Sequence, residues 1–306
     1  MISNSNRHVI PSMLAPSPID SAVSGSLQRA QGRAHVAFAC PSGPAGERGT
    51  RLADLYQSGC AKIRLPRTRG ERQAVLLNTA GGIAGGDRLD YSAAWGGGTQ
   101  AVVTSQAAER VYRSLGDAGE VSNRLIVGDG AQACWLPQET IVFNGARLDR
   151  QLEADLSSSA SLLAVEAVVL GRAAMGESVD CVSLRDRWRV RRDGRLVFAD
   201  DTRLEGDARA ILAGPATGAG ARAFATILQA SDDAQARIDE ARAVLARCRS
   251  ERLCCGASAW AGTGADAGGG VLVVRMLSAD ARVLRDAIMT FLQDWRGTDL
   301  PRVWHC

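Results

Sequence analysis

Lysine and histidine are scarce in this chain of 306 residues. Lys62 is the only lysine, so a phosphate-binding loop of the G-x-x-x-x-G-K-[ST] type has no lysine to reach the terminal phosphates of a nucleotide. The three histidines, His8, His35 and His305, lie far apart along the chain, and their spacing predicts neither a histidine-assisted nucleophile nor a two-histidine metal site. These shortages argue against nucleotide hydrolysis and histidine-based catalysis.

Long apolar runs and a strong net charge are also missing. No stretch approaches the roughly 18 apolar residues of a membrane-spanning helix, and the first residues lack the charged-then-apolar pattern of a signal peptide. The formal net charge is only +3, with basic and acidic residues interspersed, which does not indicate a nucleic-acid surface. We expect a soluble, cytoplasmic protein that binds neither membrane nor nucleic acid.

Local metal-binding motifs are absent as well. The eight cysteines, spread from Cys40 to Cys306, form no C-x-x-C pair, and the chain has no H-E-x-x-H sequence. Most cysteines follow or interrupt apolar segments, which favours reduced and mostly buried thiols over a disulfide framework. We therefore expect no tightly bound cofactor.

What the chain does contain is a series of short apolar runs. Residues 1–30 are rich in Ser, Pro and Asn and are predicted to form a flexible N-terminal tail, followed by one domain over residues 31–306. Within that domain, the repeated alternation of short apolar runs with turn residues predicts a mainly β fold. The predicted strands cover residues 34–39, 60–65, 73–77, 89–95, 100–105, 124–128, 133–136, 140–144, 161–170, 182–191, 195–199, 222–229, 252–260 and 271–277.

Two segments in the C-terminal half have helical periodicity instead. They lie near residues 233–248 and 279–295, and each has an apolar stripe that we expect to pack on the β body. Asp232 or Asp233 is predicted to cap the first helix, and Ser278 the second. The second stripe includes Phe291 and Trp295, a pattern more typical of core than of a cofactor site.

The most unusual segment is the sequence N-T-A-G-G-I-A-G-G-D-R at residues 78–88. Its glycine spacing and the strand-like residues that follow do not match the dinucleotide-binding fingerprint. Two interpretations stay open, a glycine-rich hairpin turn that presents Asp87 and Arg88 at the surface, or a functional loop. The structural glycines of this loop are Gly81, Gly82, Gly85 and Gly86.

Three carboxylates near glycines or within motifs are the remaining polar candidates: Asp87, Glu139 and Glu177. Two of them could form the general acid and base of a β-rich hydrolase. They could equally be ligands for a cation in transit, or anchors for arginines within the fold. A plain β structural or adhesion module is a third class, but it does not account for the Gly-Gly-Asp and Gly-Glu motifs.

Five segments together resemble the urease accessory protein UreD family, also called UreH, and they occur in that family's order. The resemblance extends over about residues 33–306. Besides residues 78–88, the segments are T-S-Q-A-A at 104–108 with V-Y-R-S at 111–114, W-L-P-Q-E-T-I at 135–141, G-R-A-A-M-G-E at 171–177 and L-P-R-V-W at 300–304.

The resemblance implies a scaffold protein with no enzymatic activity of its own. Members of the family join a UreF-like helical protein and a UreG-like GTPase to apo-urease, so that nickel reaches the urease metallocentre. The implied fold is a single domain of stacked, helically coiled β-sheets with two α-helices. The family is also thought to carry an internal passage for nickel, and the matching positions here are Asp87 and Glu177. The long Ser/Pro-rich start and the His305-Cys306 ending depart from the family pattern.

Overall fold

The computed structural model describes residues 1, 29–41, 49–68, 70–172, 175–248, 250–262 and 269–306. The predicted tail therefore lies, except for its ends, outside the described residues. Strands account for 52% of the structure and helical residues for 14%, which confirms the predicted mainly β fold. No helix in the described part of the chain is both long and apolar enough to cross a membrane.

The strands form two sheets. Sheet A has seven strands in the order β14 (Arg195–Gly206), β13 (Val182–Arg192), β11 (Ala146–Leu156), β8 (Gly119–Val127), β5 (Arg88–Trp95), β1 (Gln31–Ala39) and β2 (Arg51–Gly59). Sheet B has ten strands, eight of them in the order β16 (Leu253–Ala261), β17 (Gly270–Ser278), β15 (Ala223–Ser231), β12 (Ser161–Leu170), β9 (Gln132–Leu136), β6 (Gln100–Ser105), β4 (Arg72–Asn78) and β3 (Ala61–Arg64). The two short strands β10 (Thr140–Val142) and β7 (Glu109–Val111) complete sheet B, where β10 pairs with both β12 and β7.

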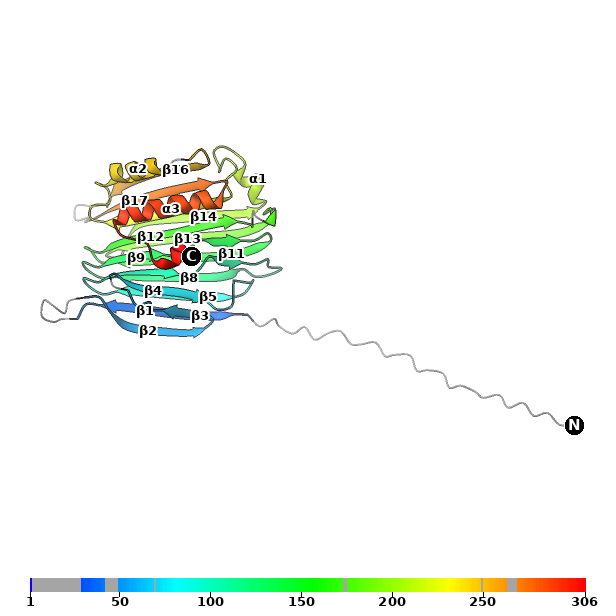
Figure 1. Cartoon of the computed structure of the whole chain (residues 1–306), viewed down its shortest axis with the longest axis horizontal. Coiled ribbons are helices and arrows are strands. Elements are labelled where there is room, and N and C mark those ends of the chain that lie inside the picture. The colour runs from blue at the N-terminus through cyan, green and yellow to red at the C-terminus, as the bar shows by residue number, and fades with distance from the viewer. Residues whose placement is uncertain (2–28, 42–48, 69, 173–174, 249, 263–268) are drawn as a thin grey trace.

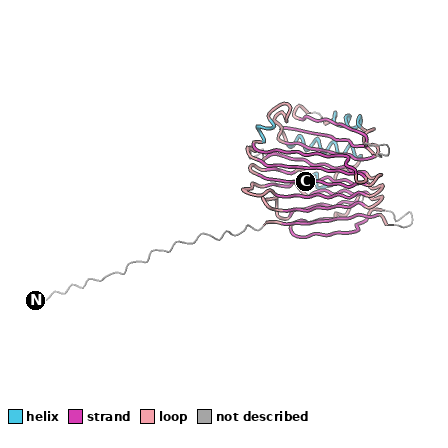
Figure 2. Tube along the Cα trace, turned by 180° about the vertical axis from the view of Figure 1, so that it is seen from behind, coloured by secondary structure: helices cyan, strands magenta, loops and turns pink. Residues whose placement is uncertain are grey.

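The middle of the chain coils between the two sheets. Strands β4, β6, β9 and β12 run parallel in sheet B, while the strands between them in sequence, β5, β8 and β11, run parallel in sheet A. Each turn of the coil adds one rung to each sheet, so the strands appear as a stack (Figure 1; Figure 2 shows it from behind). Antiparallel pairs such as β1 with β2 and β13 with β14 lie at the ends of sheet A. This solenoid-like arrangement confirms the predicted stacked, helically coiled sheets.

Alternation along the strands produces two apolar cores. Because successive strand residues point to opposite faces, Leu162, Ala164 and Val168 of β12 lie in the core between the two sheets, whereas Leu163 and Val165 face the helices. We call the first the inter-sheet core and the second the helix-covered core. The central strands of sheet B are therefore buried on both faces and are mostly apolar.

Two helices cover the outer face of sheet B, as predicted. Helix α2 spans Ile238–Arg247 and α3 spans Ala281–Arg296, and α3 lies across the strands in Figure 1. The buried stripe of α3, which includes Phe291 and Trp295, belongs to the helix-covered core. Gly297 ends α3 in the left-handed conformation, with φ of 62°.

The predicted helix caps were wrong. Asp280 caps α3, since its side chain accepts a hydrogen bond from the Arg282 N–H, while Ser278 accepts from the Asp280 N–H instead. Helix α2 begins after Arg237 without a side-chain cap. The Asp233 carboxylate accepts from the Ser231 hydroxyl, so this acid closes the turn before the helix. Several capping residues stood close together in sequence, and only the local backbone path selected among them.

Some elements were missed by the sequence analysis. Every predicted strand has a counterpart, but β2, β7 and β11 were not predicted, nor were the short helices α1 (Ala208–Leu212) and η2 (Arg302–His305). Strand β2 is exposed along most of its length and carries little apolar pattern. In β11 the alternation is clear but is interrupted by Arg150, a charged residue on the buried face.

The cysteines are less buried than predicted. Five are half-buried and three are exposed. Burial raises the pKa of the Cys134 and Cys248 thiols to about 11, so these two are protonated at neutral pH. Their surroundings fit the expected reduced state.

Candidate functional site

A cavity of about 240 Å³ lies between the two sheets. Its apolar wall includes Leu76, Ile83, Leu89, Trp135 and Leu148, which come from both sheets and from the glycine loop. Its polar lining is made of Asn78, Tyr91, Ser105, Gln106, Arg110, Asn123, Gln138, Thr140, Arg150 and the carboxylates Glu109 and Glu166. An internal space lined by two carboxylates is chemically unlike the rest of the interior.

The cavity reaches the surface between two of the recognised motifs. Gly81, Gln106, Ala107 and Arg110 line it and are exposed to solvent. Gly81 belongs to the glycine loop, and Gln106 and Ala107 belong to the T-S-Q-A-A segment. Two of the five segments that carry the resemblance thus lie at the cavity mouth.

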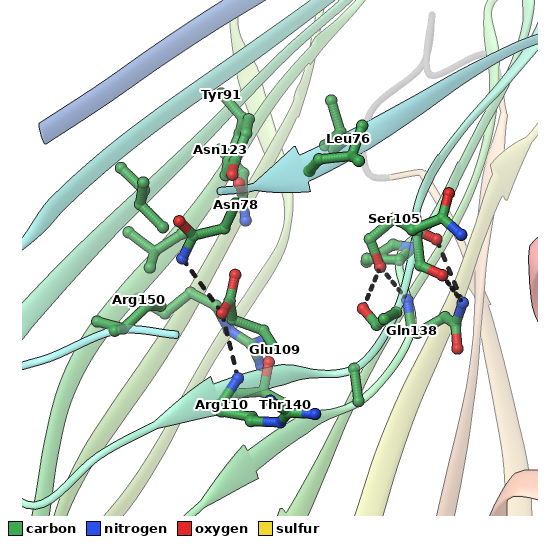
Figure 3. A pocket seen from close by; sticks show the side chains of 18 of the residues that line it. Leu76, Asn78, Tyr91, Ser105, Glu109, Arg110, Asn123, Gln138, Thr140 and Arg150 are labelled. Carbon is green, nitrogen blue, oxygen red and sulfur yellow. Dashed lines mark hydrogen bonds between the residues drawn. The ribbon is translucent and has the colours of Figure 1, made fainter. Parts of the chain in front are cut away.

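Glu109 lies on the wall and is held by neutral donors. Its Oε1 accepts from the Asn78 side-chain amide at 3.3 Å and from the Arg110 backbone N–H at 3.1 Å (Figure 3). Burial raises the pKa of Glu109, and these hydrogen bonds offset only part of that effect. Burial also raises the pKa of Tyr91, and the charge of Glu109 adds to the shift. The charge of Arg110 also lowers the pKa of Glu109, but burial outweighs all of these contacts and the net shift is upward.

Glu166 lies deeper, in a charged cluster that we call the Arg150 triad, with Arg150 and Asp186. Arg150 donates from Nε and Nη2 to the two oxygens of Asp186 at 3.1 and 2.6 Å, and its Nη1 lies 2.5 Å from Oε2 of Glu166. Nη1 also donates to Thr140 Oγ1 at 3.0 Å, while Trp135 Nε1 donates to Glu166 Oε1 at 3.2 Å. All three charged residues are at most 6% exposed.

Strand register explains how the triad forms. Arg150 of β11 stands directly opposite Asp186 of the parallel neighbour β13, and both side chains occupy core-facing positions of sheet A. Glu166 shares the inter-sheet face of β12 with Leu162 and Ala164, so it meets Arg150 across the two sheets. Burial raises the pKa of Glu166, the Arg150 charge opposes this and the Asp186 charge adds to it, for a net rise. One cation therefore serves two buried carboxylates.

The C-terminal motif holds the loops at the cavity mouth. Gln138 Nε2 donates to the carbonyl oxygens of Ser105, Gln106 and Val303 at 3.3, 3.0 and 2.8 Å. Arg285 of α3 joins the same network through the Trp304 carbonyl at 2.9 Å. Three recognised motifs meet here, which predicts that they act as one structural unit.

Asp87, a predicted metal residue, is a buried turn anchor. One carboxylate oxygen accepts from the Ala30 N–H and the other from the Ala84 N–H, both at 2.7 Å. The glycine loop crosses from β4 in sheet B to β5 in sheet A, so the hairpin interpretation with Asp87 at the surface was wrong. Only Arg88 is exposed, where it pairs with Glu120.

The glycines of this loop allow close approach. A Cβ added at Gly82 would lie 2.2 Å from the Tyr112 ring, and one added at Gly85 would lie 1.9 Å from Ser114 Oγ. Tyr112 and Ser114 belong to the V-Y-R-S segment, so the glycines let two recognised segments pack together.

Glu177 and Glu139 each have a separate arginine partner. Glu177 accepts from Arg172 Nε at 2.8 Å and from the backbone N–H of Asn144 at 3.1 Å. Its burial raises the pKa of Glu177, but these hydrogen bonds outweigh that effect and the net shift is downward. Glu139 lies 2.6 Å from Arg285.

The three predicted carboxylates are not brought together. None of Asp87, Glu139 and Glu177 lines the inter-sheet cavity, and in the described part of the chain no hydrogen bond or ion pair joins any two of them. The inter-sheet cavity is therefore not lined by a hydrolase-type carboxylate pair drawn from these three residues. Nor do the described residues contain a cluster of three or more histidine, cysteine or acidic side chains placed to hold a metal ion.

The sequence analysis missed the cavity residues, although two carried a signal. Glu166 is the only charged residue in the apolar run of β12, and Arg150 breaks the apolar alternation of β11. Charged residues at core-facing strand positions need a partner. Glu109 has no such signal, because its strand is only three residues long.

Comparison with known proteins gives one consistent family. The sequence model of the UreD urease accessory protein family matches residues 30–305. A relative from Methylorubrum extorquens, urease accessory protein UreD 3, is 49% identical over 91% of this chain and 91% of its own length. Urease accessory protein UreD from Rhizobium etli is 45% identical over 91% of this chain and 96% of its own. The chain therefore belongs to the UreD family of urease accessory proteins.

Proposed function

We propose that this protein is a urease maturation scaffold that helps deliver nickel to the urease metallocentre, and that nickel passes through the inter-sheet cavity. The observation that carries the proposal is the placement of Glu109 and Glu166 in one cavity that opens at the family motifs. The protein itself is proposed to have no catalytic activity.

The donor set suits a cation in transit. Carboxylate and amide oxygens bind nickel more weakly than thiolates or imidazoles, and the cavity lining contains neither cysteine nor histidine. Transport needs sites that bind strongly enough for entry and weakly enough for release. Two carboxylates, with neutral amides and arginines beside them that compete with a bound cation, meet that requirement.

The scaffold role is proposed to involve a UreF-like protein, a UreG-like GTPase and apo-urease. The apolar stripe of α3 is already used inside the molecule, so partner contacts must use other surfaces. Exposed apolar side chains are available on β2, at Leu52, Leu55 and Tyr56.

Asp87 and Glu177 stay predicted residues of the nickel route. Both carboxylates already accept backbone N–H bonds, so a cation at either position has to replace those contacts. Glu109 and Glu166 line the open space directly and are the stronger candidates.

The test uses Glu109→Gln and Glu166→Gln in the chain co-expressed with its partner proteins and urease. Each substitution nearly keeps the shape of the side chain and removes its charge. At Glu109 both hydrogen bonds reach the same oxygen and can be kept, whereas at Glu166 the amide can accept from only one of Trp135 and Arg150. We expect the complex to assemble and the nickel content and activity of urease to fall. The matched control is Glu120→Gln, which removes an exposed carboxylate on sheet A.

Complex formation and urease nickel content are measured on the same samples. Full nickel content with both variants and an intact complex would contradict the route. Loss of assembly together with nickel would show that these carboxylates serve the fold.

A further inference from the structure

The Arg150 triad is asymmetric with respect to the cavity. Arg150 and Glu166 line the open space, while Asp186 does not (Figure 3 shows Arg150 among the lining side chains). Arg150 donates two hydrogen bonds to the carboxylate of Asp186, from Nε and Nη2 of its guanidinium, at 3.1 and 2.6 Å. It contacts Glu166 through Nη1 alone, which it also shares with Thr140. The carboxylate that faces the cavity is therefore the one that Arg150 holds by fewer contacts.

This asymmetry allows one partner to leave. If Glu166 turns away, Arg150 keeps a bidentate carboxylate and is not left as an unpaired buried charge. Glu166 cannot turn away alone, because a bare carboxylate in this interior has a high desolvation cost. It needs another cation, and the cavity is where such a cation would arrive.

We propose that Glu166 is a ligand for a divalent cation and that Arg150 pairs with it while no cation is bound. Asp186 sets how readily Arg150 releases Glu166. An arriving Ni²⁺ takes over Glu166 while Arg150 stays paired with Asp186. Arg150 then reclaims Glu166 when the ion moves on. This inference rests on the proposed function, because it requires that nickel enters the inter-sheet cavity.

The starting charge of the triad favours the arrival of a cation. Arg150 with two carboxylates carries a formal charge of −1 when both are ionised, so the site attracts a cation before any bond is broken. The raised pKa of Glu166 agrees with a carboxylate that its single guanidinium contact does not fully compensate. The tethered guanidinium competes with the ion for Glu166 and so prevents tight retention.

The decisive variant is Asp186→Asn, which alters no residue of the cavity lining. It removes the second carboxylate charge that shares Arg150 with Glu166, so Arg150 should hold Glu166 more tightly. We expect the apparent dissociation constant for Ni²⁺ to rise by at least about tenfold. Asp186→Glu restores the charge and should return the constant toward the wild-type value.

Arg150→Lys gives an independent test of opposite sign. A lysine keeps the positive charge but lacks the planar fork that engages both carboxylates at once. Glu166 should then be released more easily, and Ni²⁺ should bind more tightly than in the wild type. Arg88→Lys makes the same change at an exposed arginine that pairs with Glu120 outside the cavity lining, and as the matched control it should change the constant by less than about twofold.

The measurement is equilibrium dialysis with Ni²⁺ on the chain co-purified with its UreF-like partner, with Glu166→Gln giving the background from other sites. Circular dichroism and co-purification check that each variant is folded. Wild-type affinity in folded Asp186→Asn, or shifts of the same sign in Asp186→Asn and Arg150→Lys, would overturn the inference. If Asp186→Asn does not fold, the dissociation constant of Arg150→Lys is the test. A constant below that of the wild type supports the inference, and one equal to or above it overturns the inference. If Glu166→Gln binds Ni²⁺ like the wild type, the proposed route itself fails.

Discussion

The inter-sheet core and the helix-covered core share sheet B but are built differently. The inter-sheet core encloses a cavity and a buried triad of ionisable residues. The helix-covered core is apolar, and its buried Trp295 satisfies its indole N–H through the Gln229 side chain at 3.1 Å. The helix-covered core is thus filled by packed apolar side chains. The inter-sheet core instead contains open space and buried charged groups.

The difference teaches where function resides in this fold. A buried ion cluster is a weak source of stability, because desolvation offsets most of the attraction between its charges. Its presence in the inter-sheet core therefore favours a functional role over a structural one. The helix-covered core, in contrast, stabilises sheet B mainly by apolar burial.

The largest expected effect comes from matched substitutions to methionine in the two cores. Arg150→Met leaves Glu166 and Asp186 without a cation and should lower the free energy of unfolding by about 3–5 kcal/mol. Leu292→Met in the helix-covered core nearly conserves volume and should cost less than about 1.5 kcal/mol. Urea denaturation of both variants measures the difference. Equal losses of unfolding free energy in the two variants would mean that removing Arg150 costs no more than a conservative change in an apolar core.

Removing the whole triad should recover most of that stability. The triple variant Arg150→Met, Glu166→Gln and Asp186→Leu leaves no charge at these three positions, and the amide introduced by Glu166→Gln can still accept the hydrogen bond from Trp135. We expect stability from near wild type to about 4 kcal/mol above it. Urease matured with this variant should contain little nickel. Normal nickel content in that urease would show that the triad is not needed for nickel delivery.

A smaller effect is expected at the turn that bounds the inter-sheet core. Asp87→Asn supplies one acceptor oxygen where two N–H groups, those of Ala30 and Ala84, need one each. The loss should be about 1–3 kcal/mol in the free energy of unfolding. Asp90→Asn on the exposed face of β5 is the control and should stay within about 0.5 kcal/mol.

Urease nickel content from the Asp87→Asn samples tests the second role of this residue. A fall in nickel with an intact complex would support its predicted place in the nickel route. Unchanged nickel with lowered stability would leave it a turn anchor.

The smallest effect is a difference in pH dependence between two carboxylates. The pKa of Glu109 is raised above 4.5, so the folded protein keeps a proton that the unfolded chain releases, and stability falls as pH rises through that window. Glu109→Gln removes this loss, and its stability relative to wild type should improve as the pH rises above 4.5. The pKa of Glu177 is lowered, so its stabilisation is present above 4.5 and lost as pH falls through the lowered pKa. Stability curves in which Glu109→Gln and Glu177→Gln respond alike would contradict both directions.

Much of the architecture could be predicted because it is encoded locally. Short apolar runs between turn residues predicted the strands, and helical periodicity predicted α2 and α3. Elements without an apolar pattern, such as the exposed β2, were not predicted, because their conformation depends on pairing with a neighbouring strand. Caps escaped for a related reason, since Ser278 and Asp280 are both competent and the backbone path selects one.

The sequence by itself determined the β character, the two main helices and, through five ordered motifs, the family. Only the tertiary structure decided which charges meet. Glu166 and Arg150 belong to strands of different sheets, and Asp186 lies 36 residues from Arg150 along the chain, so no local spacing predicts their contact. Strand periodicity states which face a side chain occupies, but the pairing of faces depends on how the coil stacks its rungs. The candidate site therefore forms only when the two sheets are stacked in the folded protein.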